Sequence, residues 1–177
     1  MSDYYGTVNE GNAYFAARLH SYDWTQATVA DRLAALVQAT ELIDQFAYIG
    51  YKKTTQDALD AIEAVDGDPT TDANRTVLRA AEQAQALEFP RGADTDVPTE
   101  IETACYLIAK ALLSGRDPDM DLEALASRGV QYGDVKTLYS RASNTQDHTA
   151  HLIPSPQAFN LLRPFFRERY QFDMHKV

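Results

Sequence analysis

The sequence predicts a mainly α-helical protein: a small antiparallel helical bundle with a short β-arm or hairpin and an extended C-terminal tail. Three observations lead to this prediction. Apolar residues recur at helical spacing in several segments, helix-capping residues precede most of these segments, and only residues 130–139 change to a period typical of extended structure. With 177 residues, 45% of them hydrophobic, the chain is long enough for one domain with its own core.

The N-terminal third contains two helix signals. Thr7 and Glu10 have the spacing of a capping box, which predicts a helix over residues 8–19. Thr28 can cap a second and stronger helix, whose apolar residues form a continuous stripe. Trp24 is expected in the loop between the two helices, because a large ring often closes the end of a bundle.

Residues 54–88 have weaker helical patterns. Two segments, 56–65 and 72–87, are rich in good helix formers, but their apolar stripes are thin. The sequence Asp-Gly-Asp-Pro between them is a strong turn signal. We therefore expect a peripheral insertion at about 54–88, outside the main core.

The second half begins with another strong helix after Pro98. Cys105 lies on its apolar stripe, and a buried thiol is favoured there because no basic neighbour in the sequence would stabilise a thiolate. A short helix is expected over 117–128 and an extended arm at about 130–141. Ser155 is the expected N-cap of the last helix, with a proline at the first helical position.

These elements define the predicted organisation of the chain. A single helical-bundle domain occupies residues 1–166, and a C-terminal docking tail occupies 167–177. The expected core consists of Phe15, Leu19, Leu33, Leu36, Val37, Ile43, Ile101, Cys105, Ile108 and Leu112.

Composition excludes several classes of protein. Acids outnumber bases 26 to 16, which argues against a surface that neutralises phosphates throughout. The single cysteine cannot form an internal disulfide and fits a reducing compartment. The apolar runs are too short for a membrane span, and the first residues lack the pattern of a signal peptide. We expect a protein assembled in a cytoplasm, without membrane contact.

The acidic residues are concentrated in one region. Residues 54–100 contain 11 acids and only 3 bases. One interpretation is a solvated acidic face. The other is an acidic surface turned toward something that must not bind, such as DNA in passage, with Asp57, Asp60 and Glu63 as candidate channel-lining residues.

Motifs of catalysis and cofactor binding are absent from the sequence. There is no glycine-rich phosphate loop, Cys-x-x-Cys or His-Glu-x-x-His motif. Residues 147–151 place two histidines near an aspartate, but further metal ligands are missing nearby, and a polar loop is the alternative. Three aspartates alternate over 117–121 without the glycine and distal glutamate of a calcium loop. We expect no enzyme, no metal and no cofactor.

An ordered series of short motifs extends over nearly the whole chain except about 54–86. The motifs are Tyr5-Gly6-Thr7-Val8-x-Glu10-x-Asn12-Ala13-Tyr14-Phe15-Ala16-Ala17-Arg18-Leu19, Trp24, Ala39-Thr40-x-Leu42-Ile43-Asp44, Leu87-x-Phe89-Pro90-Arg91, Val97-Pro98-x-x-Ile101, Gly133-Asp134-Val135 and Pro154 to Phe166 with Leu161-Leu162-Arg163-Pro164-Phe165. This series resembles a family of tailed-bacteriophage proteins often labelled DnaT-like single-stranded-DNA-binding proteins. Its members look like head–tail connector proteins, also called adaptor or head-completion proteins.

The resemblance implies a structural protein of the virion neck. Similar proteins are small helical bundles that form a twelve-fold ring below the portal, extend the DNA channel and link head to tail. The implied partners are further copies of the chain, the portal protein, a downstream tail or neck protein, and double-stranded DNA that passes without specific binding. The family label implies instead single-stranded DNA binding in phage replication.

Charge distinguishes these two hypotheses. A single-strand binder needs a basic groove with interleaved aromatic rings, and only the C-terminal tail has that character. A ring around a DNA passage needs a lumen that repels phosphate and a head-to-tail contact between subunits. The acidic balance therefore favours the connector, with the single-strand binder as the alternative.

The C-terminal segment is the candidate docking element for the portal. Large apolar residues and bases alternate after Pro164, a mixture that is common in interface hot spots. The candidate docking residues are Phe165, Phe166, Arg167, Arg169, Tyr170, Phe172 and Met174. The alternative is a tail that folds back on its own bundle.

Overall fold

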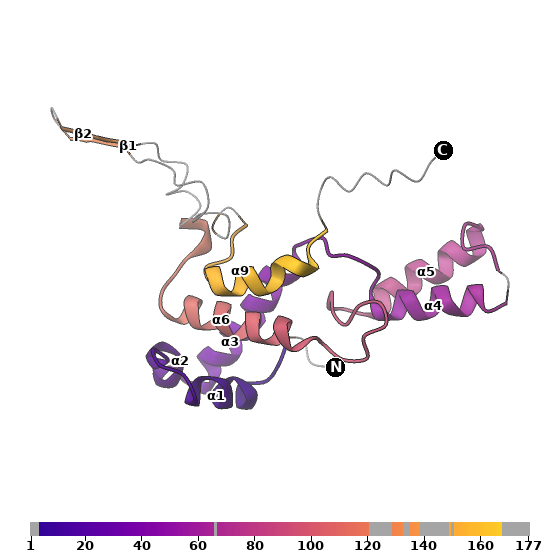
Figure 1. Ribbon diagram of the computed structural model, residues 1–177, viewed down its shortest axis with the longest axis horizontal. Coiled ribbons are helices and arrows are strands. Elements are labelled where there is room, and N and C mark those ends of the chain that lie inside the picture. Colours follow the sequence, from indigo (N-terminus) through magenta and orange to yellow (C-terminus); the bar gives the residue numbers. More distant parts are fainter. Residues whose placement is uncertain are drawn as a thin grey trace.

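The computed structural model describes residues 4–65, 67–120, 129–132, 135–138, 149 and 151–167. The protein is mainly α-helical, as the sequence predicts (Figure 1). The helices are α1 (Val8–Ala16), α2 (Tyr22–Gln26), α3 (Val29–Asp44), α4 (Lys53–Glu63), α5 (Asp72–Ala84), α6 (Thr99–Leu113) and α9 (Pro156–Leu162), followed by the 3₁₀ helix η1 (Arg163–Phe165). The strands are β1 (Gly129–Tyr132) and β2 (Val135–Leu138). None of the described helices is long and apolar enough to cross a membrane.

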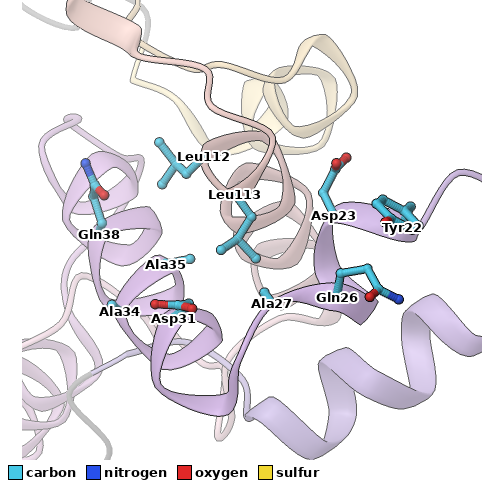
Figure 2. Close-up of a pocket in the computed structure, with 10 residues that line it drawn as sticks. All are labelled: Tyr22, Asp23, Gln26, Ala27, Asp31, Ala34, Ala35, Gln38, Leu112 and Leu113. Carbon is cyan, nitrogen blue, oxygen red and sulfur yellow. The ribbon is translucent and has the colours of Figure 1, made fainter.

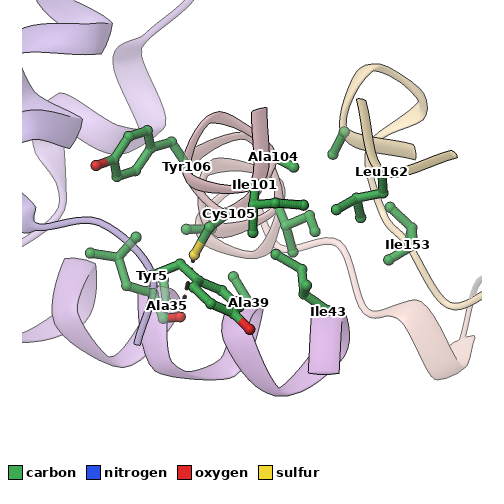
Figure 3. Close-up of a cluster of buried hydrophobic side chains, with 14 of the residues drawn as sticks. Tyr5, Ala35, Ala39, Ile43, Ile101, Ala104, Cys105, Tyr106, Ile153 and Leu162 are labelled. Atoms are coloured by element: carbon green, nitrogen blue, oxygen red, sulfur yellow. Dashed lines mark hydrogen bonds between the residues drawn. The ribbon is translucent and has the colours of Figure 1, made fainter. Parts of the chain in front are cut away.

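The core lies between α3, α6 and α9. Helix α6 packs against α3 on one side and α9 on the other, and Figure 3 shows their side chains meeting around α6. Leu36, Ile43, Ile108 and Leu162 have no exposed surface, so each stabilises the fold by full removal of apolar area from water. Cys105 is also fully buried, with its sulfur 3.6 Å from the Leu36 carbonyl oxygen.

The predicted core is correct at its centre and wrong at one end. Phe15, Leu36, Ile43, Ile101, Cys105 and Ile108 are buried as expected, and Val37 and Leu112 are partly buried. Leu19, however, is 87% exposed, because α1 ends at Ala16 and the residues after it leave the helix. Leu33 is 40% exposed, because it lies in the first turns of α3, and the buried part of this helix begins only at Ala35.

The predicted helix starts at Thr7, Thr28 and Ser155 are confirmed. The Thr7 hydroxyl accepts a hydrogen bond from the Glu10 amide at 3.1 Å. Thr28 forms a complete capping box, and the Ser155 hydroxyl caps α9. Each side chain satisfies an amide that has no partner inside the helix, which is why these residues mark the first turns.

Trp24 corrects the expectation of a loop between the first two long helices. It lies in the short helix α2, is 1% exposed, and donates from its indole nitrogen to Asn12 at 2.9 Å. A Cβ atom at Gly11 would lie 2.6 Å from the Trp24 ring, so this position of α1 needs glycine. The ring therefore joins α1 and α2 to the core rather than covering the bundle from a loop.

Besides the core helices, the described residues contain a pair of helices, α4 and α5, and a pair of strands, β1 and β2. Helices α4 and α5 pack on each other to form the helical hairpin, which projects from the body in Figure 1. This hairpin corresponds to the segment expected as a peripheral insertion. Strands β1 and β2 pair antiparallel, with Gly129 opposite Leu138 and Tyr132 opposite Val135, inside the region expected as an arm.

Some expectations concern residues outside the described part of the chain. The helix expected over 117–128 is described only as far as residue 120, and residues 118–120 are helical. The arm is described as the two strands alone. The docking tail beyond Arg167 lies outside the described residues.

Candidate functional site

The candidate channel-lining acids share one face of α4. Asp57, Asp60 and Glu63 are all exposed, and their spacing of three residues keeps them within about a third of the helix circumference. Asp57 forms an ion pair with Lys53 one turn earlier, and Asp60 accepts a hydrogen bond from Gln56 at 2.8 Å. The acids are therefore displayed on the helical hairpin, away from the core.

The helical hairpin joins the body through two antiparallel segments, 48–52 and 88–92, which we call the neck. Lys52 and Arg91 form an isolated antiparallel bridge within it. The Lys53 amide donates to the Pro90 carbonyl at 3.0 Å, and the Gly92 amide donates to the Tyr51 carbonyl at 2.9 Å. Backbone pairing of this kind fixes the direction in which α4 leaves the body.

Arg91 is the side chain that holds the neck together. Its guanidinium donates to the carbonyls of Tyr48, Ile49 and Gly50, and it forms an ion pair with Glu88. Lys52 pairs with the same carboxylate at 3.1 Å. Only 12% of the Arg91 side chain is exposed, so these charged contacts are little screened by water.

Gln85 completes the attachment from the end of α5. It is 5% exposed, and its amide nitrogen donates to the carbonyls of Leu87 and Pro90 at 3.0 and 2.9 Å. Its side-chain oxygen accepts from the Thr54 amide at 3.3 Å. Because both ends of the amide have partners, the neck is ordered by specific hydrogen bonds as well as by packing.

A buried polar pair connects the neck to the N-terminal segment. The Tyr5 hydroxyl donates to the Asp44 carboxylate and accepts from the Phe89 amide at 3.2 Å. The second oxygen of Asp44 accepts from the Glu88 amide at 3.4 Å. Burial raises the pKa of Asp44 to about 6 and the pKa of Tyr5 above its usual value.

Sequence analysis did not find this pair or the neck. Tyr5, Asp44 and Phe89 stand far apart in the chain, and Asp44 looks like an ordinary polar residue at the end of a helix. The one sequence signal was that Tyr5, Asp44 and Phe89 each belong to a motif of the series that resembles the phage family. Their contacts depend on tertiary packing, which no local spacing encodes.

The beginning of the predicted docking tail is joined to the body. Phe166 forms an isolated bridge with Tyr48, the Ile49 amide donates to the Phe165 carbonyl, and the Arg167 amide donates to the Ala47 carbonyl, both at 2.9 Å. The rings of Phe165 and Phe166 are partly buried against Phe89, Phe46 and Tyr48. Arg167 is exposed. The other candidate docking residues are Arg169, Tyr170, Phe172 and Met174, and they lie outside the described part of the chain.

A groove of about 590 Å³ opens between α2, the first half of α3 and the end of α6 (Figure 2). Its apolar lining comes from Ala27, Ala34, Ala35, Leu112 and Leu113. Two carboxylates, Asp23 and Asp31, and the exposed ring of Tyr22 stand at its rim. We call this surface the acidic groove, and sequence analysis did not predict it.

Cys105, His151 and Asp117 are engaged in packing or in local hydrogen bonds. Burial raises the pKa of the Cys105 thiol to about 12, so the expectation of a buried, unreactive cysteine agrees with its environment. The His151 ring stacks with Phe166 and lies 5.1 Å from Phe159 between ring centroids. Asp117 accepts from the Asp119 amide at 3.0 Å, and no group of three or more metal ligands occurs among the described residues.

Comparisons with protein-family models, with curated proteins and with solved structures find no match to this chain. A function must therefore be argued from the fold, the placement of charge and the attachment of the projecting elements.

Proposed function

We propose that the protein is a structural, non-enzymatic head–tail connector of a tailed phage. Copies of the chain form a ring below the portal, which the resemblance implies to be twelve-fold, in the neck of the virion. The ring extends the DNA channel and links the head to a downstream tail or neck protein. Double-stranded DNA passes through the lumen without specific binding.

The observation that carries this proposal is the acidic helical hairpin on its hydrogen-bonded neck. Asp57, Asp60 and Glu63 are exposed on α4, and the neck contacts of Arg91 and Gln85 hold the hairpin in a defined direction. An enclosed surface with fixed negative charge repels phosphate, which allows a duplex to slide instead of adhering. The hydrogen bonds of the neck keep the acidic side chains of α4 at a defined position within the proposed ring.

The C-terminal segment supplies the proposed contact with the portal. Its first residues, Phe165 to Arg167, are fastened to the body by backbone hydrogen bonds and ring contacts. The sequence after them contains further aromatic residues and bases, which suit a negatively charged surface on the portal protein. These contacts fix the positions of Phe165, Phe166 and Arg167 on the body.

The first experiment measures assembly with the portal protein of the same phage. The purified protein, alone and mixed with portal rings, is examined by sedimentation velocity and electron microscopy. We expect a ring on the portal, and we expect deletion of residues 168–177 to remove portal binding while helix content is retained. A protein that never binds portal, or binds single-stranded DNA tightly in its place, contradicts the connector and favours the alternative.

The second experiment tests the channel. A variant with Asp57→Lys, Asp60→Lys and Glu63→Lys should still assemble particles, but genome passage should be impaired because the lumen would then attract phosphate. The control is Glu41→Lys with Asp94→Lys and Asp96→Lys, which makes the same change of charge at exposed positions outside the helical hairpin. Normal genome passage in the α4 variant would show that the α4 acids only solvate the surface.

A further inference from the structure

The acidic groove has a complementary surface elsewhere on the same chain. Segment 47–51 pairs with Phe165 to Arg167 on one side and with the 88–92 part of the neck on the other. Tyr48 points into the body and is 2% exposed, whereas Ile49 and Tyr51 are 57% and 54% exposed. We call the exposed side of this segment, with Ala47 and Arg167, the 47–51 face.

The 47–51 face is apolar and carries one cationic side chain, Arg167. Ile49 and Tyr51 are large apolar side chains in water, and Arg167 beside them forms no ion pair with any described residue. The nearby guanidinium of Arg91 is already paired with Glu88. Exposed apolar side chains beside an arginine are typical of a protein–protein contact.

The acidic groove has the opposite character. Alanine and leucine side chains line it together with Gln26 and Gln38. Asp23 and Asp31 also line it; the Asp31 carboxylate accepts a hydrogen bond from Thr28 in the capping box of α3, and Asp23 forms no ion pair among the described residues. The groove is a shallow depression that is largely open to solvent, so it offers a contact surface to an exposed face rather than an enclosed pocket for a small molecule. The two surfaces are thus complementary in charge and in apolar content.

The two surfaces lie at opposite ends of α3. Residues 31–38 of α3 line the groove, and the 47–51 face follows the last residue of the helix. Ala34 and Asp44 are separated by about 15 Å along the axis, at about 1.5 Å per residue. One subunit therefore presents both surfaces at once, to two different neighbours.

We propose that the occupant of the acidic groove is the 47–51 face of a second copy of this chain. The contact joins two different surfaces, so it is head-to-tail, and each added copy leaves one groove and one face free. Such contacts either close into a ring or continue as a filament. This inference rests on the proposed connector function, because it supplies the subunit contact that a connector ring requires.

The test uses one variant for each surface. Ala34→Arg fills the groove from an exposed helical position where arginine is a good helix former. Ile49→Asp places a carboxylate on the opposing face without removing a backbone hydrogen bond. Matched controls are Ala80→Arg and Val77→Asp, at exposed positions on α5. Circular dichroism and the melting temperature verify that each variant is folded.

Self-association is measured by native mass spectrometry and sedimentation equilibrium, with and without portal rings. Each surface variant alone should self-associate about 30-fold or more weakly than the wild type, as expected for loss of a hot spot. The two variants mixed should form a one-to-one dimer and no larger species. In that dimer the intact groove of the Ile49→Asp copy holds the intact face of the Ala34→Arg copy.

The possible outcomes separate the inference from the connector proposal. If the wild type forms rings and Ala34→Arg or Ile49→Asp assembles equally well, the inferred contact is wrong. The connector proposal is unaffected by that result. Failure of the mixed variants to dimerise, when the wild type assembles, would also overturn the inferred contact. A wild-type protein that remains a monomer alone and on portal rings would overturn both proposals.

Discussion

Replacement of Arg91 by alanine should loosen the neck while the helical core stays intact. Arg91 donates to carbonyls at Tyr48, Ile49 and Gly50 and pairs with Glu88. Its only contact with the buried apolar cluster is at the periphery, through the carbonyl and ring of Tyr48, and none of its hydrogen bonds reaches α3, α6 or α9. The variant should therefore open the base of the helical hairpin locally, without global unfolding.

The magnitude follows from the bonds that are lost. A hydrogen bond from a charged donor contributes about 1.5–3 kcal/mol and a neutral one about 1 kcal/mol. Glu88 keeps its second partner, Lys52, at 3.1 Å, so the full cost of an unpaired buried carboxylate is not incurred. We expect a local loss of about 2–4 kcal/mol, because the contacts overlap and are not additive.

Hydrogen exchange measured by mass spectrometry is the assay. The Ile49 and Gly92 amides, which donate to Phe165 and Tyr51, should exchange about 30- to 1000-fold faster in Arg91→Ala, since each 1.4 kcal/mol is tenfold. Amides in the middle of α6 should not change.

Arg79→Ala is the matched control, because Arg79 is exposed on α5 and forms no ion pair with the described residues. Unchanged exchange of Ile49 and Gly92 in Arg91→Ala would refute the role of the guanidinium. Equal acceleration in α6 would show that the neck and the core unfold as one unit.

Three further predictions concern stability and reactivity. Leu36→Ala should lower the free energy of unfolding by about 2–5 kcal/mol in urea titrations, because the side chain is fully buried and leaves a cavity; an unchanged midpoint would contradict this. Burial favours protonated Asp44 in the folded state, so its contribution to stability should be greatest below its unfolded pKa, near 3.8, and be lost as pH rises through about 6. The loss should be about 1–2 kcal/mol after allowance for partial exposure, and a wild-type minus Asp44→Asn difference that does not vary with pH would refute it. Cys105 should resist thiol reagents until the protein unfolds, since it is buried and its pKa is raised to about 12; rapid labelling of the folded protein would be the opposite result.

Sequence predicted one part of the candidate site, the exposed acids of α4, but neither the neck nor the acidic groove. The sequence indicated that the α4 acids are exposed, because a helix with a thin apolar stripe must present charge to water. It did not indicate the neck, since Arg91 meets the carbonyl of Ile49 across 42 residues of chain. It did not indicate the groove, whose walls come from three separate helices.

The sequence by itself determined the helical class, the starts at Thr7, Thr28 and Ser155, and the centre of the core. Capping and apolar periodicity act between residues within about one or two turns, so they are legible in local spacing. Only the tertiary structure decided that Trp24 lies in a helix and donates to Asn12, that Leu19 is exposed and that the neck is held by side chains distant in sequence. Burial and hydrogen bonding between distant segments depend on which surfaces meet, and that is decided by the packing of the whole chain.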